Sequence, residues 1–148
     1  EKVWDSVSEF DEKFWEERYE SIRNFEKHLS ENGTTVIKIF LHISKDEQKK
    51  RFLDRIDEQE KNWKFSMGDL PERALWDEYM KAYERAINET SKDHAPWFVI
   101  PGDDKWFARI AAIQVIIDAL EGMNLKFPKL SEEDLKALEG AKKQLESE

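Results

Sequence analysis

The chain has 148 residues, of which 39% are hydrophobic, 39% charged and 12% aromatic. This length suits one domain of about 100–150 residues, and so many aromatic side chains exclude a disordered chain. The net charge of −9 argues against duplex nucleic-acid binding, and the absence of cysteine excludes disulfides and thiolate catalysis.

The first predicted elements are a helix and a strand. Apolar residues recur at three- and four-residue steps over residues 12–31, which is the spacing of one helix face. Asn32 and Gly33 end this helix, because both tolerate the left-handed backbone common after a helix. Residues 34–43 are predicted to form a strand. Its middle is apolar on both faces, which favours a parallel strand covered on each side.

An irregular segment separates the next two predicted helices. Ser44 is expected to cap a helix over residues 45–59, which has only a thin apolar face. Residues 60–70 then mix aromatic and polar side chains without a helical period. Asp69 is the expected N-cap of the second helix, which the spacing predicts over residues 72–90.

A second strand and two more helices complete the chain. Prolines lie at the ends of the predicted strand, residues 95–101, where a sheet tolerates them. The following helix, residues 105–121, has a wide apolar stripe and is expected to be well buried. The residues of this stripe are Phe107, Ile110, Ile113, Ile117 and Leu120. Ser131 caps a final helix, and its sparse apolar face predicts a peripheral position.

Two short strands connected through helices imply parallel pairing and an α/β fold. The strand at residues 34–43 needs a neighbour on both edges, and the sequence supplies only one. We therefore interpret the chain as the second half of a larger α/β domain. The alternatives are a complete small domain and a sheet that pairs across a dimer.

Common catalytic and nucleotide-binding motifs do not occur in this sequence. The three histidines (His28, His42 and His94) are scattered, which disfavours a zinc hydrolase. The phosphate-binding loop Gly-x-x-x-x-Gly-Lys-Ser/Thr is absent, because no two glycines lie close enough together. No apolar run approaches the ~20 residues that span a membrane.

Basic residues gather at residues 49–73, with seven cations against six acids in an otherwise acidic chain. Arg51 and Arg55 lie four residues apart, so one helix face can present two guanidinium groups to one phosphate. Lys61 and Lys64 lie in the irregular segment, which could close over a ligand. The alternative is a solvated helix face, with the arginines paired to Glu47, Asp54 or Glu58.

Several short motifs occur in this sequence in an order and at a spacing typical of one known family. They are Phe40-Leu41-His42-Ile43-Ser44-Lys45, Trp63-Lys64-Phe65-Ser66, Glu72-Arg73, Ala95-Pro96-Trp97 and Asp103-Asp104-Lys105. With the opening helix, they resemble the C-terminal half of the polyphosphate kinase 2 family. Its members are P-loop kinases that move a phosphoryl group between inorganic polyphosphate and a nucleotide.

The resemblance implies a P-loop kinase-like, three-layer α/β/α fold, of which this chain is a helix-rich half with two short parallel strands. Residues 1–126 would be the C-terminal portion of that domain, with a lid over residues 49–73. Residues 127–148 would form a peripheral helix. The family's phosphate-binding loop and catalytic Asp belong to the N-terminal half. We therefore expect Mg²⁺ in the complete enzyme, no metal ligand in this chain, and no phosphoryl transfer by this chain alone.

The resemblance also implies roles for the basic residues. Arg51 and Arg55 would be catalytic, because positioned cations neutralise the charge that develops during phosphoryl transfer. Lys61, Lys64 and Arg73 would bind the substrate, since repeated charges attract a polyanion strongly.

Asp103 and Asp104 follow the second strand, at the sheet edge where open α/β folds bind ligands. Asp103 is a candidate substrate contact, and Asp104 is interpreted as a helix cap more readily than as a nucleoside contact. The implied partners are inorganic polyphosphate and AMP, ADP or GDP, in a cytoplasmic homo-oligomer with no nucleic acid or membrane. The alternatives are a non-catalytic helical interaction module and half of another P-loop nucleotide kinase.

Overall fold

Helices alternate with two strands in the computed structural model, which describes residues 10–147. The first nine residues of the predicted domain therefore lie outside the described residues. The elements are α1 (Glu12–Glu31), β1 (Lys38–His42), α2 (Lys45–Asp57), the 3₁₀ helix η2 (Gln59–Lys64), α3 (Asp69–Ala74), α4 (Trp76–Thr90), β2 (Trp97–Pro101), α5 (Lys105–Gly122) and α6 (Glu132–Glu146).

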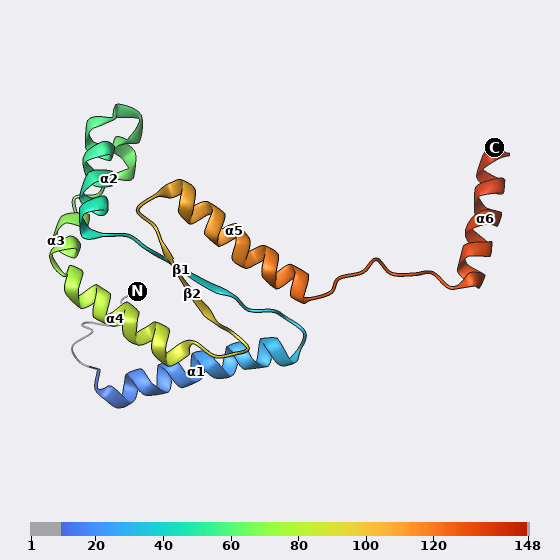
Figure 1. Ribbon diagram of the computed structural model, residues 1–148, viewed down its shortest axis with the longest axis horizontal. Coiled ribbons are helices and arrows are strands. Elements are labelled where there is room, and N and C mark those ends of the chain that lie inside the picture. The colour runs from blue at the N-terminus through green and yellow to red at the C-terminus, as the bar shows by residue number, and fades with distance from the viewer. Residues whose placement is uncertain (1–9, 148) are drawn as a thin grey trace, which may run out of the picture.

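The two strands pair in parallel, with Lys38 opposite Trp97 and His42 opposite Pro101. This pairing confirms the α/β class and the two short parallel strands expected from the sequence. In Figure 1 the strands lie between α5 on one side and α1 with α4 on the other. Both strands are shorter than predicted. At their start, the Lys38 amide donates a hydrogen bond to the Pro96 carbonyl, one residue before β2 begins.

A buried polar network joins four elements where the strands begin. The Lys38 ammonium donates to Glu26 Oε2 at 2.6 Å and to the Thr90 carbonyl at 2.9 Å. The Trp97 indole donates to Thr90 Oγ1 at 2.8 Å, and the ammonium also lies 5.4 Å from the Trp97 ring centroid. Glu26 and Thr90 are 8% and 3% exposed. The network thus ties α1 and α4 to the sheet.

The buried apolar core of the described residues is small. Its buried apolar members among the described residues are Ala95, Ile100 and Ala108. The prediction that the stripe of α5 is well buried is wrong, because Phe107, Ile110 and Ile113 are each more than half exposed. The sheet covers the side of α5 that carries Ala108 and leaves the stripe open.

Helix ends agree with the predictions except in the middle of the chain. Gly33 has the expected positive φ of 85°, and the Ser44 and Ser131 side chains cap α2 and α6. Asp69 is not an N-cap, because α3 already begins there and its N-terminus has no side-chain cap. The single helix predicted over residues 72–90 is two helices, separated at Leu75.

The last helix stands apart from the other elements. An extended segment follows α5 and carries α6 away from the sheet (Figure 1). No helix in residues 10–147 combines the length and the apolar character needed to cross a membrane.

We expect Lys38→Met to lower the free energy of unfolding by about 3 kcal/mol, because it leaves the Glu26 carboxylate buried without its cation. Urea denaturation measures this change. Lys27→Met is the matched control, since Lys27 is exposed on α1 and should change stability by less than about 0.5 kcal/mol. Equal effects of the two substitutions would contradict the assigned role of the network.

Candidate functional site

The candidate site lies at the edge where both strands end. β1 is followed by Ser44, whose Oγ accepts a hydrogen bond from the Glu47 amide at 3.0 Å and begins α2. β2 is followed by Asp104, whose Oδ1 accepts from the amides of Trp106 and Phe107 and begins α5. The interpretation of Asp104 as a helix cap is therefore confirmed. Because the strands are parallel, the N-termini of α2 and α5 come together.

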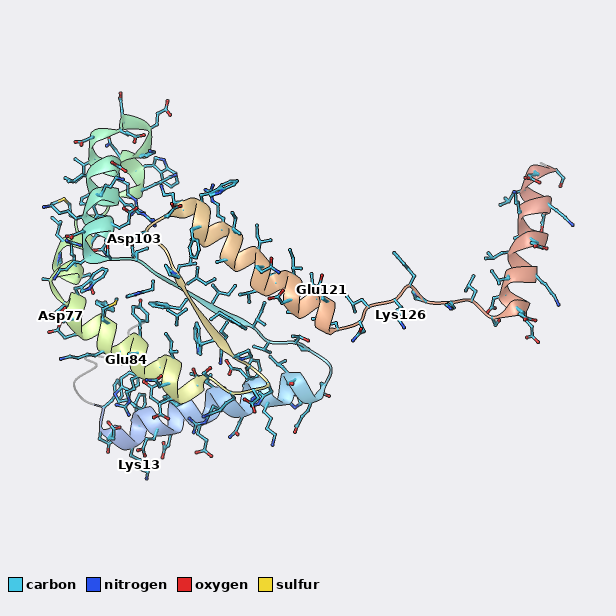
Figure 2. The ribbon with its side chains drawn as sticks, viewed as in Figure 1. Lys13, Asp77, Glu84, Asp103, Glu121 and Lys126 are labelled. Atoms are coloured by element: carbon cyan, nitrogen blue, oxygen red, sulfur yellow. The ribbon has the colours of Figure 1, made fainter. Side chains whose placement is uncertain are left out.

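Two short contacts fix the ends of the strands to each other. The Ser44 amide donates to Asp103 Oδ1 at 2.7 Å, and the Gly102 amide donates to the His42 carbonyl at 2.7 Å. Gly102 has no room for a side chain, since a Cβ there would lie 2.8 Å from Ile43 Cγ2. Figure 2 labels Asp103 at this junction of β2, α5 and the start of α2.

The hydrogen bonds from Ser44 hold the pKa of Asp103 below its ordinary value, and the charge of Arg51 acts in the same direction. The carboxylate is therefore already engaged in holding the two loops together. Its predicted contact with substrate stays a prediction.

Arg51 connects α2 to the turn between β2 and α5. Its Nε donates to Glu47 Oε1 at 2.7 Å, and its Nη2 donates to the Gly102 carbonyl at 2.7 Å. Pairing with Glu47 was one of the alternatives left open by the sequence, and the structure shows it for Arg51. Arg55 differs, because its guanidinium carbon lies 5.7 Å from the centroid of the Phe52 ring.

A basic pocket of about 230 Å³ opens between α2, η2 and α5. We use "basic pocket" for the space lined by Arg51, Asp54, Arg55, Lys61, Lys64 and Lys105. It brings together four of the predicted site residues, the two arginines and the two lysines of η2. Lys105 was missed by the sequence analysis. Its signal is its position as the first residue of a helix after a parallel strand.

The cations of the basic pocket differ in how far neighbouring carboxylates neutralise them. Arg51 forms an ion pair with Glu47, and Lys61 forms one with Glu58, in which Lys61 Nζ lies 2.5 Å from Glu58 Oε2. The other three cations form no salt bridge with any residue in the described range 10–147; they are Arg55, Lys64 and Lys105. These charges are therefore available to an anion, and the pocket has only one acidic residue in its lining.

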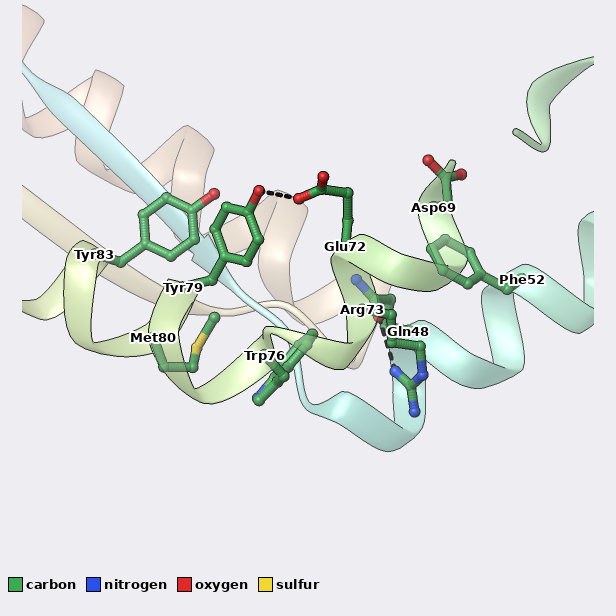
Figure 3. A pocket seen from close by; sticks show the side chains of 9 residues that line it. All are labelled: Gln48, Phe52, Asp69, Glu72, Arg73, Trp76, Tyr79, Met80 and Tyr83. Carbon is green, nitrogen blue, oxygen red and sulfur yellow. Dashed lines mark hydrogen bonds between the residues drawn. The ribbon is translucent and has the colours of Figure 1, made fainter. Parts of the chain in front are cut away.

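Arg73 is not part of the basic pocket. Its Nη1 donates to the Lys45 carbonyl at 2.7 Å and to Gln48 Oε1 at 2.8 Å, so it joins α3 to the start of α2. It lines a different pocket of about 200 Å³, shown in Figure 3, in which the Tyr79 hydroxyl donates to Glu72. That hydrogen bond raises the pKa of Tyr79. The predicted contact of Arg73 with substrate stays a prediction.

Mg²⁺ in phosphoryl-transfer enzymes is usually bound through one or two carboxylates together with substrate phosphates. Within residues 10–147 no three His, Asp or Glu side chains gather in a group that could hold a metal ion. The Arg and Lys side chains that line the basic pocket can bind and position anions.

Comparison with known proteins gives a consistent set of matches. The family model described as Polyphosphate kinase 2 (PPK2) matches residues 1–128. The ADP-polyphosphate phosphotransferase of Rhodopseudomonas palustris is 52% identical over 136 residues, covering 92% of this chain and 47% of that protein. The AMP/ADP-polyphosphate phosphotransferase of Meiothermus ruber is 50% identical over 115 residues, covering 78% of this chain and 43% of that protein.

A solved structure agrees with these sequence matches. The crystal structure of polyphosphate kinase 2 from Arthrobacter aurescens TC1 aligns with a TM-score of 0.82 and 49% identity, over 88% of this chain and 47% of that chain. The chain thus spans about half the length of each of these relatives.

The link between Asp103 and Ser44 predicts a specific pH dependence of stability. A carboxylate whose pKa is lowered on folding stabilises the protein above its ordinary pKa of 3.8, and this contribution is lost as the pH falls through the lower folded pKa. Asp103→Asn should therefore be less stable than the wild type near neutral pH, and the difference should shrink below about pH 4. Denaturant unfolding over this pH range measures the difference. Asp57→Asn, at the exposed end of α2, is the control. A stability difference between Asp103→Asn and the wild type that does not change with pH would contradict the account.

Proposed function

Because the chain belongs to the polyphosphate kinase 2 family, we propose that it forms the polyphosphate-binding half of a polyphosphate:nucleotide phosphotransferase. Its fold is the α/β, P-loop kinase-like fold expected from the sequence. The observation that carries the proposal is the basic pocket, where five cations surround one carboxylate in a chain of net charge −9. A chain of phosphates is the anion that suits such a site, because each unit brings a charge.

The pocket is suited to the charge that phosphoryl transfer creates. Negative charge builds on the oxygens of the transferring group, and fixed cations stabilise it without reorganising. Arg55 is not neutralised by a described carboxylate and is the stronger candidate for direct contact. Arg51 keeps Nη1 available beyond its bonds through Nε and Nη2, and it also fixes α2 against the core.

The nucleotide and the metal ion belong to the proposal for the complete enzyme. The names of the relatives support AMP or ADP as the nucleotide, and GDP is the further acceptor expected from the sequence. We propose that the complete enzyme uses Mg²⁺ held by residues outside this chain, and that this chain alone transfers no phosphate. The cytoplasmic location and the homo-oligomer remain predictions.

The isolated chain should bind polyphosphate with an affinity that falls steeply as salt increases, because exposed cations carry the interaction. Arg55→Ala should raise Kd about tenfold, as expected for the loss of one charged hydrogen-bonding group. Isothermal titration calorimetry measures both effects. Lys50→Ala removes an exposed cation from the same helix, outside the lining of the basic pocket, and should leave Kd nearly unchanged. If Arg55→Ala and Lys50→Ala raised Kd equally, the overall charge of the chain, and not the basic pocket, would determine binding.

Phosphoryl transfer by the isolated chain should stay at background with polyphosphate, Mg²⁺ and either AMP or ADP. The reason is that no phosphate-binding loop occurs in this sequence. Coupled detection of ADP and ATP formation measures the rate, with a full-length family member as the positive control. Sustained turnover would refute this part of the proposal.

A further inference from the structure

We infer that Asn62 is a positioning residue for polyphosphate binding. Its side-chain amide clamps η2 to the end of α2 and so holds Lys61 and Lys64 in the same pocket as Arg55. The inference rests on the proposed function, to which it adds a residue that carries no charge and does not line the basic pocket.

The amide of Asn62 holds the last turn of α2. Its Nδ2 donates to the Arg55 carbonyl at 2.8 Å and to the Ile56 carbonyl at 2.7 Å. The last carbonyls of a helix have no partner within that helix, and these two belong to the final turn of α2, which ends at Asp57. One side chain in the middle of η2 therefore satisfies two backbone acceptors of α2.

Few other interactions fix the angle between α2 and η2. Glu58 is the single residue between the two helices, and its backbone is extended. η2 has no side-chain cap at its N-terminus and packs mainly against α2. The rings of Phe52 and Phe65 give a second contact, with their centroids 5.7 Å apart. The Asn62 amide and this ring pair thus hold η2 against α2.

The geometry of η2 separates the clamp from the side chains that line the pocket. A 3₁₀ helix has three residues per turn, so side chains three residues apart lie on the same side of it. Asn62 and Phe65 share the side that meets α2. Lys61 and Lys64 share another side, which lines the basic pocket. A rotation of η2 away from α2 would therefore withdraw both lysines from the pocket together.

Asn62 has no donor left for the anion itself. An amide side chain carries two N–H groups, and the carbonyls of α2 accept both hydrogen bonds from Asn62. Its remaining oxygen is an acceptor and would repel a phosphate oxygen. The effect of Asn62 on binding must therefore pass through the lysines. Because Arg55, Lys61 and Lys64 repel one another, a clamp that fixes them in advance spares the anion the cost of gathering them.

The test is a double-mutant cycle, in which tripolyphosphate is titrated calorimetrically into the 148-residue chain. Asn62→Leu keeps a side chain of similar size without either donor, and it should raise Kd about fivefold. Lys61→Ala combined with Lys64→Ala should raise Kd by the same factor, which is the size of about two exposed charge contacts. Adding Asn62→Leu to the variant that lacks both lysines should change Kd less than about twofold, because no lysine is left to position.

Further variants control for size and folding. Asn62→Gln keeps both donors and should bind tripolyphosphate more tightly than Asn62→Leu. Asn24→Leu makes the same exchange at an exposed position of α1 and should leave Kd unchanged. Circular dichroism checks that each variant is folded, and Asn62→Ala takes the place of Asn62→Leu in the cycle if leucine prevents folding.

The outcomes separate this inference from the proposed function. Wild-type binding that Asn62→Leu leaves unchanged would overturn the inference alone. An equal loss of affinity from Asn62→Leu with and without the two lysines would also overturn it, because Asn62 would then act on binding by another route. A wild-type chain that does not bind tripolyphosphate would overturn the proposed function, and this inference with it.

Discussion

The site depends on the way the two parallel strands are fastened at their carboxyl ends. The Ser44 amide and the Asp103 carboxylate join one loop to the other, and the contact of Gly102 with the His42 carbonyl closes the same edge. Each loop leads directly into a helix, so the link between the two loops places the N-termini of α2 and α5 side by side. Arg51 then reaches from α2 to the Gly102 carbonyl, and the basic pocket forms between the two helices and η2.

The opposite end of the sheet is held in a different way. There a buried ion pair between Lys38 and Glu26, with Thr90 and Trp97, joins α1 and α4 to the sheet. Such a pair is sensitive to loss of one partner, because the other charge stays buried. The apolar core is small, and large apolar side chains of α5 remain exposed. These open surfaces agree with a chain that spans about half the length of its relatives.

Local features of the structure and the parallel pairing of the two strands could be predicted from the sequence, whereas individual side-chain contacts between distant segments could not. Helix periodicity and the caps at Ser44 and Asp104 depend on neighbouring residues, and both were predicted. The hydrogen bond from Arg51 to the Gly102 carbonyl depends on where the β2–α5 turn lies, which no local pattern specifies. Lys105 was missed for the same reason, because its importance comes from α2 and η2, which precede it in the sequence by about a third of the chain. The burial expected for α5 failed because an apolar stripe predicts only a preference, and packing needs a partner surface.

The central claim is that an anionic chain binds where α2, η2 and the start of α5 meet. A titration of the ¹⁵N-labelled protein with tripolyphosphate, followed through its amide resonances, tests this directly. The account predicts that the amides of Arg55, Lys64 and Lys105 shift together and saturate with one dissociation constant, while those of α6 stay in place. Shifts spread evenly over exposed lysines, or confined to α1 and α6, would contradict it.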